Sequence, residues 1–335
     1  MRKVQHYLVY LIVLNILMFC LSMFLGRYHI PMGEVINAIF SPIITSGSEP
    51  SRIVTTVLFH VRLPRILLAM LIGAGLGITG ASFQGIFRNP LVSPYILGVS
   101  SGGGFGAALA ILLFNSPMAI QILAFVFGML AVGITYFIAL LGYRISTYTL
   151  VLAGIVVGSF FTALISLLKY VADIYTKLPA IVFWLMGSLA AVDISDMLRT
   201  GPIIAVCIIV LIMLRWRFNI LSLGSQEAKT LGINTTVLYL VIITLSTVIA
   251  ASIVAIAGII GWVGLVVPHL CRMMVGADHE KLLPASALMG SAYMLMVDDV
   301  ARTLVSQEIP LGIVTAIIGA PFFAYLLKRR RGGKP

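Results

Sequence analysis

The sequence predicts an all-α polytopic membrane protein, with about ten transmembrane helices packed as one unit over residues 1–335. Of these residues 60% are hydrophobic and only 10% are charged, and the mean hydropathy is +1.11. Roughly a quarter of the residues in an average soluble domain are charged, so a water-soluble globule is excluded. One crossing takes about 20 apolar residues, and this composition therefore allows roughly ten crossings.

Apolar windows locate the predicted spans. The first follows Arg2 and Lys3 and superficially resembles a secretory signal. It is too long for one, and no small-residue cleavage site follows it, so we expect it to be retained. The ten predicted spans are 8–25, 66–86, 95–114, 120–141, 149–168, 198–214, 237–257, 259–275, 283–297 and 311–327.

The positive charges predict the orientation of these spans. Of the 22 Lys and Arg residues, fourteen fall on the side that carries both termini, where only three acids lie. The other side carries eight cations and eight acids. An excess of Lys and Arg marks the cytoplasmic side, so both termini are predicted to be cytoplasmic. The net charge of +11 thus reflects membrane topology rather than nucleic-acid binding.

Two regions on the outer side are not simple spans. Residues 26–65 are mixed in composition, with Pro31, Pro42 and Pro50 as helix breakers, and they predict an outer loop carrying a short interfacial helix near 32–40. Residues 169–196 are also external, and their apolar stretch 181–189 is too short to cross. A partly re-entrant helix is the expected structure there.

The polar residues exclude several functions for the chain alone. All eleven acids fall at predicted helix ends or in loops, whereas proton- or sodium-driven transport usually needs an ionisable group in mid-membrane. No GxxxxGKS/T phosphate loop is present, so ATP hydrolysis would come from another subunit. The histidines and cysteines are dispersed, and the sequence predicts no catalytic or metal site. A partner-independent secondary transporter or channel is the alternative function.

Small residues repeat every four positions in the second predicted span. They are Gly73, Gly77, Ala81 and Gly85, which form one stripe on a helix and allow another helix to approach closely. Helix packing is favoured over direct contact with a cargo.

The segment after this span contains two prolines, at positions 90 and 94, which forbid a continuous helix. Asn89 and Leu91 lie in this bent segment, and Thr147 and Tyr148 lie in the matching inner turn. One interpretation of these residues is a purely structural turn. The other is a cytoplasmic gate between inward-facing helix ends.

The largest inner loop, 221–232, predicts a short helix with Ser225 as N-cap, Glu227 in its first turn and Gly232 as C-cap. Its apolar Leu223, Ala228 and Leu231 are unexpected in a solvated loop. They would be explained equally well by docking into a groove on a cytoplasmic partner or by packing back on the bundle.

Three of the arginines on the predicted outer side are candidate functional residues, since cations there run against the charge bias. They are Arg62, Arg65 and Arg302, the last just after Asp298 and Asp299. A local pair with these acids, or anchoring to lipid headgroups, is one interpretation. The other is a set of exposed arginines that meet carboxylates on an external protein.

Several ordered motifs resemble one family of transport proteins. The longest is RLPRILLAMLIGAGLGITGASFQGIFRNPLVSPYILGVSSGG at 62–103. It is followed by LAG at 152–154, LSLGSQEAKTLGI at 221–233, GWVGLVVPHLCR at 261–272 and a closing block over 278–327. Together they resemble the iron-siderophore, haem and vitamin B12 permeases, which are membrane subunits of binding-protein-dependent ABC importers.

This resemblance implies the type II ABC importer architecture in a bacterial or archaeal cytoplasmic (inner) membrane. The expected assembly is a homodimer of this chain with two cytoplasmic ABC ATPase subunits and an external substrate-binding protein. The ATPase subunits use ATP and Mg, and this chain itself is non-catalytic and binds no cofactor. The cargo would be a ferric siderophore, haem or cobalamin, or an oxyanion such as molybdate.

The resemblance also assigns roles to individual residues. Arg62, Arg65 and Arg302 match arginines that dock the binding protein, and Asn89, Leu91, Thr147 and Tyr148 match positions of the cytoplasmic gate. Tyr148 replaces a small hydroxyl residue of the vitamin B12 permease and would give a bulkier closure. The ATPase-coupling positions are Ser222, Leu223, Ser225, Gln226, Glu227, Ala228, Leu231 and Gly232.

Overall fold

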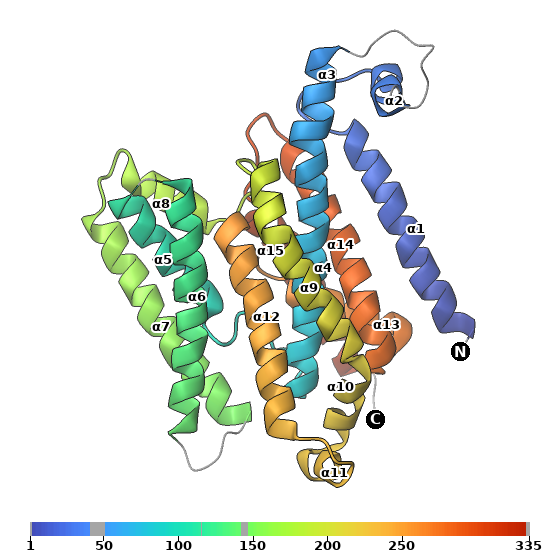
Figure 1. Cartoon of the computed structure of the whole chain (residues 1–335), viewed down its shortest axis with the longest axis vertical. Helices are drawn as coiled ribbons and strands as arrows, with labels where there is room; N and C mark the ends of the chain where they lie inside the picture. Colours follow the sequence, from blue (N-terminus) through green and yellow to red (C-terminus); the bar gives the residue numbers. More distant parts are fainter. Residues whose placement is uncertain (1, 41–50, 115, 142–146, 333–335) are drawn as a thin grey trace.

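The computed structural model describes residues 2–40, 51–114, 116–141 and 147–332, and this part of the chain is helical without strands (Figure 1). The helices are α1 (Arg2–Phe24), α2 (Met32–Phe40), α3 (Arg52–Thr56), the π-helical η1 (Val57–Arg62), α4 (Leu63–Ile86), α5 (Val99–Leu113), α6 (Pro117–Leu140), α7 (Thr147–Val171), α8 (Lys177–Leu185), α9 (Ile194–Met213), α10 (Arg215–Leu223), α11 (Ser225–Thr230), α12 (Thr235–Ala257), α13 (Val263–Val275), α14 (His279–Thr303) and α15 (Leu311–Gly332).

Six of the described helical segments are long and apolar enough to cross a membrane, which confirms a multi-pass membrane protein. They are His6–Phe24, Arg52–Ile86, Pro117–Leu140, Thr147–Val171, Ile194–Met213 and Thr235–Ala257. The other four predicted spans coincide largely with α5, α13, α14 and α15. The total of ten crossings stays a prediction.

The outer region 26–65 contains more helix than the sequence predicted. The short helix near 32–40 is present as α2, but residues from Arg52 onward are helical and continue into α4 as one 35-residue helix. Pro64 therefore does not interrupt this helix. The π-helical turn η1 immediately before it shifts the hydrogen-bond register, so that a residue without an N–H group is accommodated.

The predicted short helix at 181–189 begins four residues earlier, as α8, and its nine residues are too few to cross. The turn after α8 is held by backbone hydrogen bonds to two distant helix ends. Ser188 N donates to Ala257 O at 2.9 Å, and Leu311 N donates to Gly187 O at 2.8 Å. This turn thereby joins the end of α12 to the start of α15.

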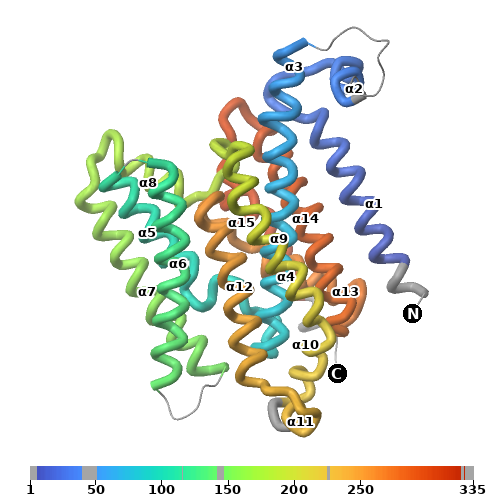
Figure 2. The backbone as a smooth tube through the Cα atoms, in the orientation of Figure 1, coloured from blue at the N-terminus to red at the C-terminus, as the bar shows by residue number. Residues whose placement is uncertain are grey.

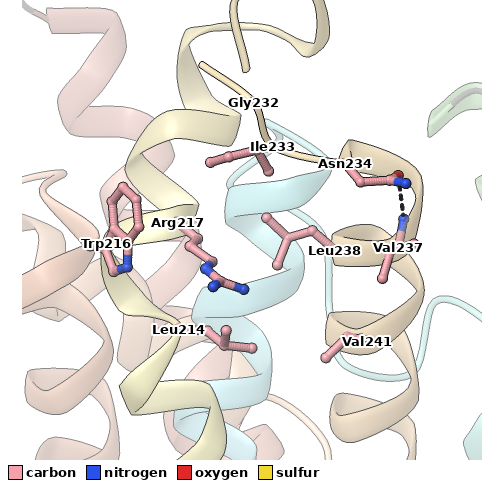
Figure 3. A pocket seen from close by; sticks show the side chains of 9 residues that line it. All are labelled: Leu214, Trp216, Arg217, Gly232, Ile233, Asn234, Val237, Leu238 and Val241. Atoms are coloured by element: carbon pink, nitrogen blue, oxygen red, sulfur yellow. Dashed lines mark hydrogen bonds between the residues drawn. The ribbon is translucent and has the colours of Figure 1, made fainter. Parts of the chain in front are cut away.

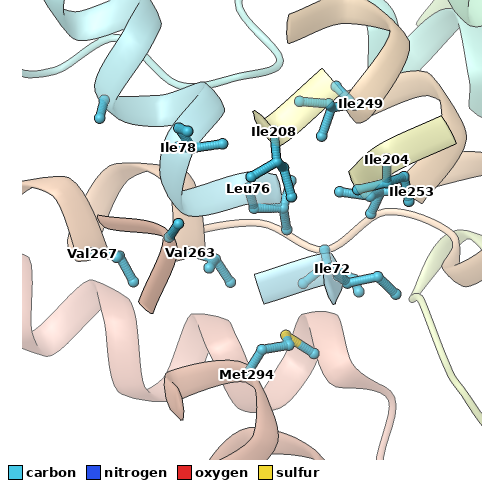
Figure 4. Packing of buried hydrophobic residues seen from close by; sticks show 14 of the residues in the cluster. Ile72, Leu76, Ile78, Ile204, Ile208, Ile249, Ile253, Val263, Val267 and Met294 are labelled. Carbon is cyan, nitrogen blue, oxygen red and sulfur yellow. The ribbon is translucent and has the colours of Figure 1, made fainter. Parts of the chain in front are cut away.

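Helix α4 is the centre of the bundle, and α9, α12, α13 and α14 all pack against it (Figures 1 and 2). Ile72 and Leu76 of α4 meet side chains of these four helices in the core that Figure 4 shows. A second group, α5 to α8, joins this core through α12. Both chain ends lie toward the same end of the molecule as α11 (Figure 1).

Close approach between α4 and α14 depends on glycines of the predicted stripe. A Cβ atom on Gly73 would lie 2.1 Å from Gly290 O, and one on Gly77 would lie 2.2 Å from Ser286 O. At the end of α4, a Cβ on Gly85 would lie 2.6 Å from the side-chain atom His279 Nε2. Ala81 is fully buried. The two backbones are therefore in direct contact around Gly73 and Gly77.

We predict that Gly77→Ala destabilises the protein by about 1–3 kcal/mol, because its methyl group would push α14 away from α4. Thermal unfolding in detergent measures the effect. Gly133→Ala, on α6, is the matched control, because a Cβ there meets no atom within 4 Å. Equal stability of the two variants would contradict the proposed backbone contact.

Candidate functional site

The predicted inner loop 221–232 forms two short helices joined by a glycine. Gly224, not Ser225, is the N-cap of α11, so the predicted cap is wrong by one residue. Gly224 has φ +145°, a conformation that side chains rarely allow, and it lets the chain turn sharply after α10. The carboxylate of Glu227 lies directly against Gly224, since a Cβ atom added to Gly224 would lie 1.8 Å from Glu227 Oε2.

The other end of α11 closes with a glycine at φ +78°, Gly232. Gly232 N donates to Lys229 O at 3.0 Å, and Ile233 N donates to Ala228 O at 3.1 Å. These two bonds form a Schellman motif, in which a left-handed glycine stands just beyond the helix. The C-cap of α11 is Leu231, so the predicted C-cap, Gly232, lies one residue beyond it.

The apolar side chains of this segment divide between the two predicted explanations. Ala228 is fully buried and packs on the bundle, whereas Leu223 and Leu231 are 64% and 61% exposed. The hydroxyl of Ser222 donates to Asn219 O at 2.6 Å. The side chains of Ser225 and Gln226 lie outside the described residues. Ala228 therefore anchors the segment to the bundle, whereas Leu223 and Leu231 point outward.

A groove of about 370 Å³ lies beside this segment, between α10 and the start of α12 (Figure 3). Its lining combines apolar side chains with one guanidinium group. The lining residues are Leu214, Trp216, Arg217, Gly232, Ile233, Asn234, Val237, Leu238 and Val241. Arg217 is exposed, and within the described residues it forms no side-chain ion pair.

Helix α10 is fastened to the start of α14. Asn219 Nδ2 donates to Asp278 Oδ1 at 2.8 Å, and Asn219 Oδ1 accepts from His279 N at 2.8 Å. The rings of Phe218 and His279 stack with centroids 5.7 Å apart. Burial, aided by the positive charge of Arg272, lowers the pKa of His279 to about 4. The imidazole is therefore neutral near pH 7.

The four predicted gate residues are exposed in the single subunit. Asn89 Oδ1 accepts a hydrogen bond from Leu91 N at 3.0 Å, which closes the turn after α4. Thr147 and Tyr148 begin α7. Their side chains are exposed, as are those of Asn89 and Leu91, and no hydrogen bond between the two pairs occurs in the described part of the chain.

The three outer arginines are buried, which corrects the expectation that they are exposed for docking. Arg62, Arg65 and Arg302 are each at most 8% exposed. Arg65 forms ion pairs with Asp298 Oδ1 at 2.9 Å and with Glu308 Oε1 at 2.8 Å. This is the local pairing that the sequence left open, with Glu308 as a further partner that was not foreseen.

The other two arginines tie α1 into the same cluster. Arg302 pairs with Asp299 and donates to Ser22 O at 2.9 Å. Arg62 Nη1 donates to Met23 O at 2.7 Å. The outer cluster, which consists of Arg62, Arg65, Asp298, Asp299, Arg302 and Glu308, therefore contains three positive and three negative side chains. Its charges are balanced inside the protein.

Within the described residues, no group of three or more His, Cys, Asp or Glu side chains is placed to hold a metal ion.

Comparison with known proteins identifies the family of this chain. The sequence matches the FecCD transport family over residues 13–329. It is 43% identical to the molybdate import system permease protein MolB of Haemophilus influenzae, over 93% of each chain. It is 42% identical to a probable iron chelatin transport system permease protein of Helicobacter pylori, over 82% of this chain and 83% of that one.

A solved structure shows the same architecture. It is a metal-chelate type ABC transporter in an inward-facing conformation, with a TM-score of 0.85 and 42% identity over 96% of this chain and 98% of that one. The bundle is thus an ABC transporter permease fold. The chain belongs to the FecCD transport family.

We predict that Arg65→Met destabilises the protein by about 3–5 kcal/mol, because Asp298 would lose its closest cation while remaining buried. Thermal unfolding in detergent measures the change. Arg52→Met removes an exposed arginine from the same continuous helix and should have little effect. Similar losses in both variants would show that the cluster does not stabilise the fold.

We also predict a pH-dependent stability that originates at His279. In the unfolded chain its pKa is near 6.5, so between pH 6.5 and pH 4 the unfolded state binds more protons and stability falls as the pH falls. At pH 5 the loss is about 2 kcal/mol. His279→Phe, which keeps a ring on Phe218, should flatten the pH profile of the melting temperature.

His60→Phe replaces an exposed histidine and should leave that profile unchanged. A profile that stays the same in His279→Phe would contradict the assignment.

Proposed function

We propose that the chain is the membrane-spanning permease subunit of an ATP-driven importer, which moves a metal chelate or an oxyanion into the cytoplasm by alternating access. The observation that carries the proposal is full-length similarity to import permeases, at 43% identity over 93% of each chain for the molybdate permease. Ferric siderophore, haem, cobalamin and molybdate are the candidate cargoes. Cargo selection would lie chiefly in a separate binding protein.

The proposed assembly contains two copies of this chain, two cytoplasmic ATPase subunits that use ATP and Mg, and an external binding protein. Similarity to a solved ABC transporter over 96% of the chain supports it. The chain would cross a bacterial or archaeal cytoplasmic membrane ten times. Both termini would be cytoplasmic, as the excess of cations on their side suggests.

The ATPase would bind at α10 and α11. Leu223 and Leu231 present apolar surface there, and the neighbouring groove adds Trp216 and the exposed charge of Arg217. A short helix with exposed leucines suits insertion into a groove on a partner. Ala228 would hold the segment on the bundle while the partner pushes it.

The cytoplasmic gate would form across the dimer from Asn89, Leu91, Thr147 and Tyr148. Their exposure at the end that also carries α11 supports this role. The binding protein would contact the opposite end. The buried arginines are not proposed as its contacts, because Arg65 and Arg302 are already paired with acids and Arg62 already donates to backbone carbonyls within the subunit.

We predict that Leu223→Arg reduces the amount of co-purifying ATPase at least about tenfold, since a buried unpaired charge at an interface costs several kcal/mol. The tagged chain is solubilised gently from its native membrane, and its partners are identified with their stoichiometry. Leu304→Arg is the matched control, because Leu304 is 67% exposed but lies beyond the end of α14, away from α11.

An equimolar P-loop ATPase that is retained by Leu304→Arg and lost by Leu223→Arg would support the proposal. Recovery of the chain alone, with uptake of molybdate or ferric chelate by vesicles without ATP, would favour the partner-independent transporter or channel.

A further inference from the structure

The turn after α4 contains an arginine in an unusual backbone conformation. Arg88 has φ +49°, and within the described residues only Trp262 shares a positive φ without being glycine. A left-handed conformation costs a residue with a Cβ roughly 1–2 kcal/mol. Such strain persists only where the surrounding structure holds it, and it frequently marks functional segments.

The Arg88 side chain reaches the coupling segment. Its Nη2 donates a hydrogen bond of 2.7 Å to Leu221 O. Leu221 lies in the last turn of α10, where carbonyl groups have no partner within the helix and carry the negative end of its dipole. A guanidinium group is therefore a matched partner for this helix end, and a charged donor makes the bond stronger than a neutral one.

The same region contains a second, rigid contact between α4 and α10. A Cβ on Gly85, one turn before Arg88, would lie 3.5 Å from Phe218 Cδ1 and 2.6 Å from His279 Nε2. The end of α4 thus rests on the stacked rings that join α10 to α14. Leu221 itself is buried, so this end of α10 is fixed on its inner side.

The turn that Arg88 begins leads directly into the proposed gate. Asn89 and Leu91 follow it in sequence and are linked by their own hydrogen bond. A displacement of α10 would therefore reach Arg88 through one hydrogen bond and reach Asn89 through one peptide unit. Among the described residues, no other side-chain hydrogen bond joins α10 to this turn.

We infer that Arg88 is a positioning residue that transmits movement of the ATPase-coupling segment to the cytoplasmic gate, through its hydrogen bond to Leu221 O. This inference rests on the proposed function, since it requires a partner that moves α10 and α11. It assigns Arg88 no contact with cargo or nucleotide. Its loss should separate ATP hydrolysis from transport rather than abolish both.

The test uses the complete complex in vesicles, where ATP hydrolysed and molybdate or ferric chelate imported are measured together. In Arg88→Met we expect hydrolysis to stay within about twofold of the unsubstituted complex while cargo moved per ATP falls at least about tenfold. Arg88→Lys, which keeps a cationic donor, should restore at least about half of the transport.

Arg27→Met is the matched control, because Arg27 also donates to a backbone carbonyl, that of Ser306, but at the opposite end of the molecule. Arg27→Met should leave the amount of cargo imported per ATP hydrolysed unchanged. If Arg88→Met fails to accumulate, Arg88→Gln, which keeps a neutral donor of shorter reach, is measured by the same criteria.

An unchanged ratio of transport to hydrolysis in the Arg88 variants would overturn the inference while leaving the proposed function intact. So would a proportional loss of both activities with a lowered melting temperature, since that is the signature of a structural role alone. Uptake by the unsubstituted protein that needs no ATP would instead contradict the proposed function.

Discussion

The contact between the backbones of α4 and α14 is the constraint on which the rest of the structure depends. Within a membrane, lipid tails are as apolar as leucine, so helices associate through close packing and polar contacts rather than through the hydrophobic effect. Gly73, Gly77 and Gly290 remove the side chains that would hold these helices apart. The pair then offers one surface on which α9, α12 and α13 assemble.

Each end of this helix pair is closed by a polar cluster. At one end, Arg65 and Arg302 neutralise Asp298 and Asp299, and α1 is bound through Ser22. Buried charges are tolerated only when they are paired and hydrogen-bonded. At the other end, Asn219, His279 and Arg88 attach α10. Movement imposed on α10 therefore acts on the α4 and α14 pair, whose opposite end is held together by the buried ion pairs.

The helical architecture was largely predictable, because apolar periods and small-residue spacing are local properties of a sequence. Each predicted span coincides largely with a helix, and three of the four stripe residues face α14. The short helix in the inner loop 221–232 was predicted from the same kind of local signal, and it is present as α11. The helix from Arg52 into α4 was missed because a π-helical turn, rather than a break, accommodates Pro64.

Side-chain partners from distant segments could not be predicted in this way. Glu308 meets Arg65, and Leu221 meets Arg88, across separations of 243 and 133 positions. An arginine beside two aspartates gives the same sequence signal whether it is exposed or buried. The packing of α1, α4 and α14 determines which of the two it is. The N-cap at Gly224 was missed because a glycine at φ +145° supplies no side-chain signal.

The central claim is that α10 moves together with the α4 and α14 pair. The most direct test is the distance between spin labels at Leu223 and Lys281, measured in the nucleotide-free and ATP-trapped complex. Labels at Tyr148 in the two subunits of the proposed dimer report whether the proposed gate has moved. The account predicts an unchanged distance from position 223 to position 281 while the Tyr148 distance changes. A shift of the first distance by more than about one helical turn, roughly 5 Å, would contradict it.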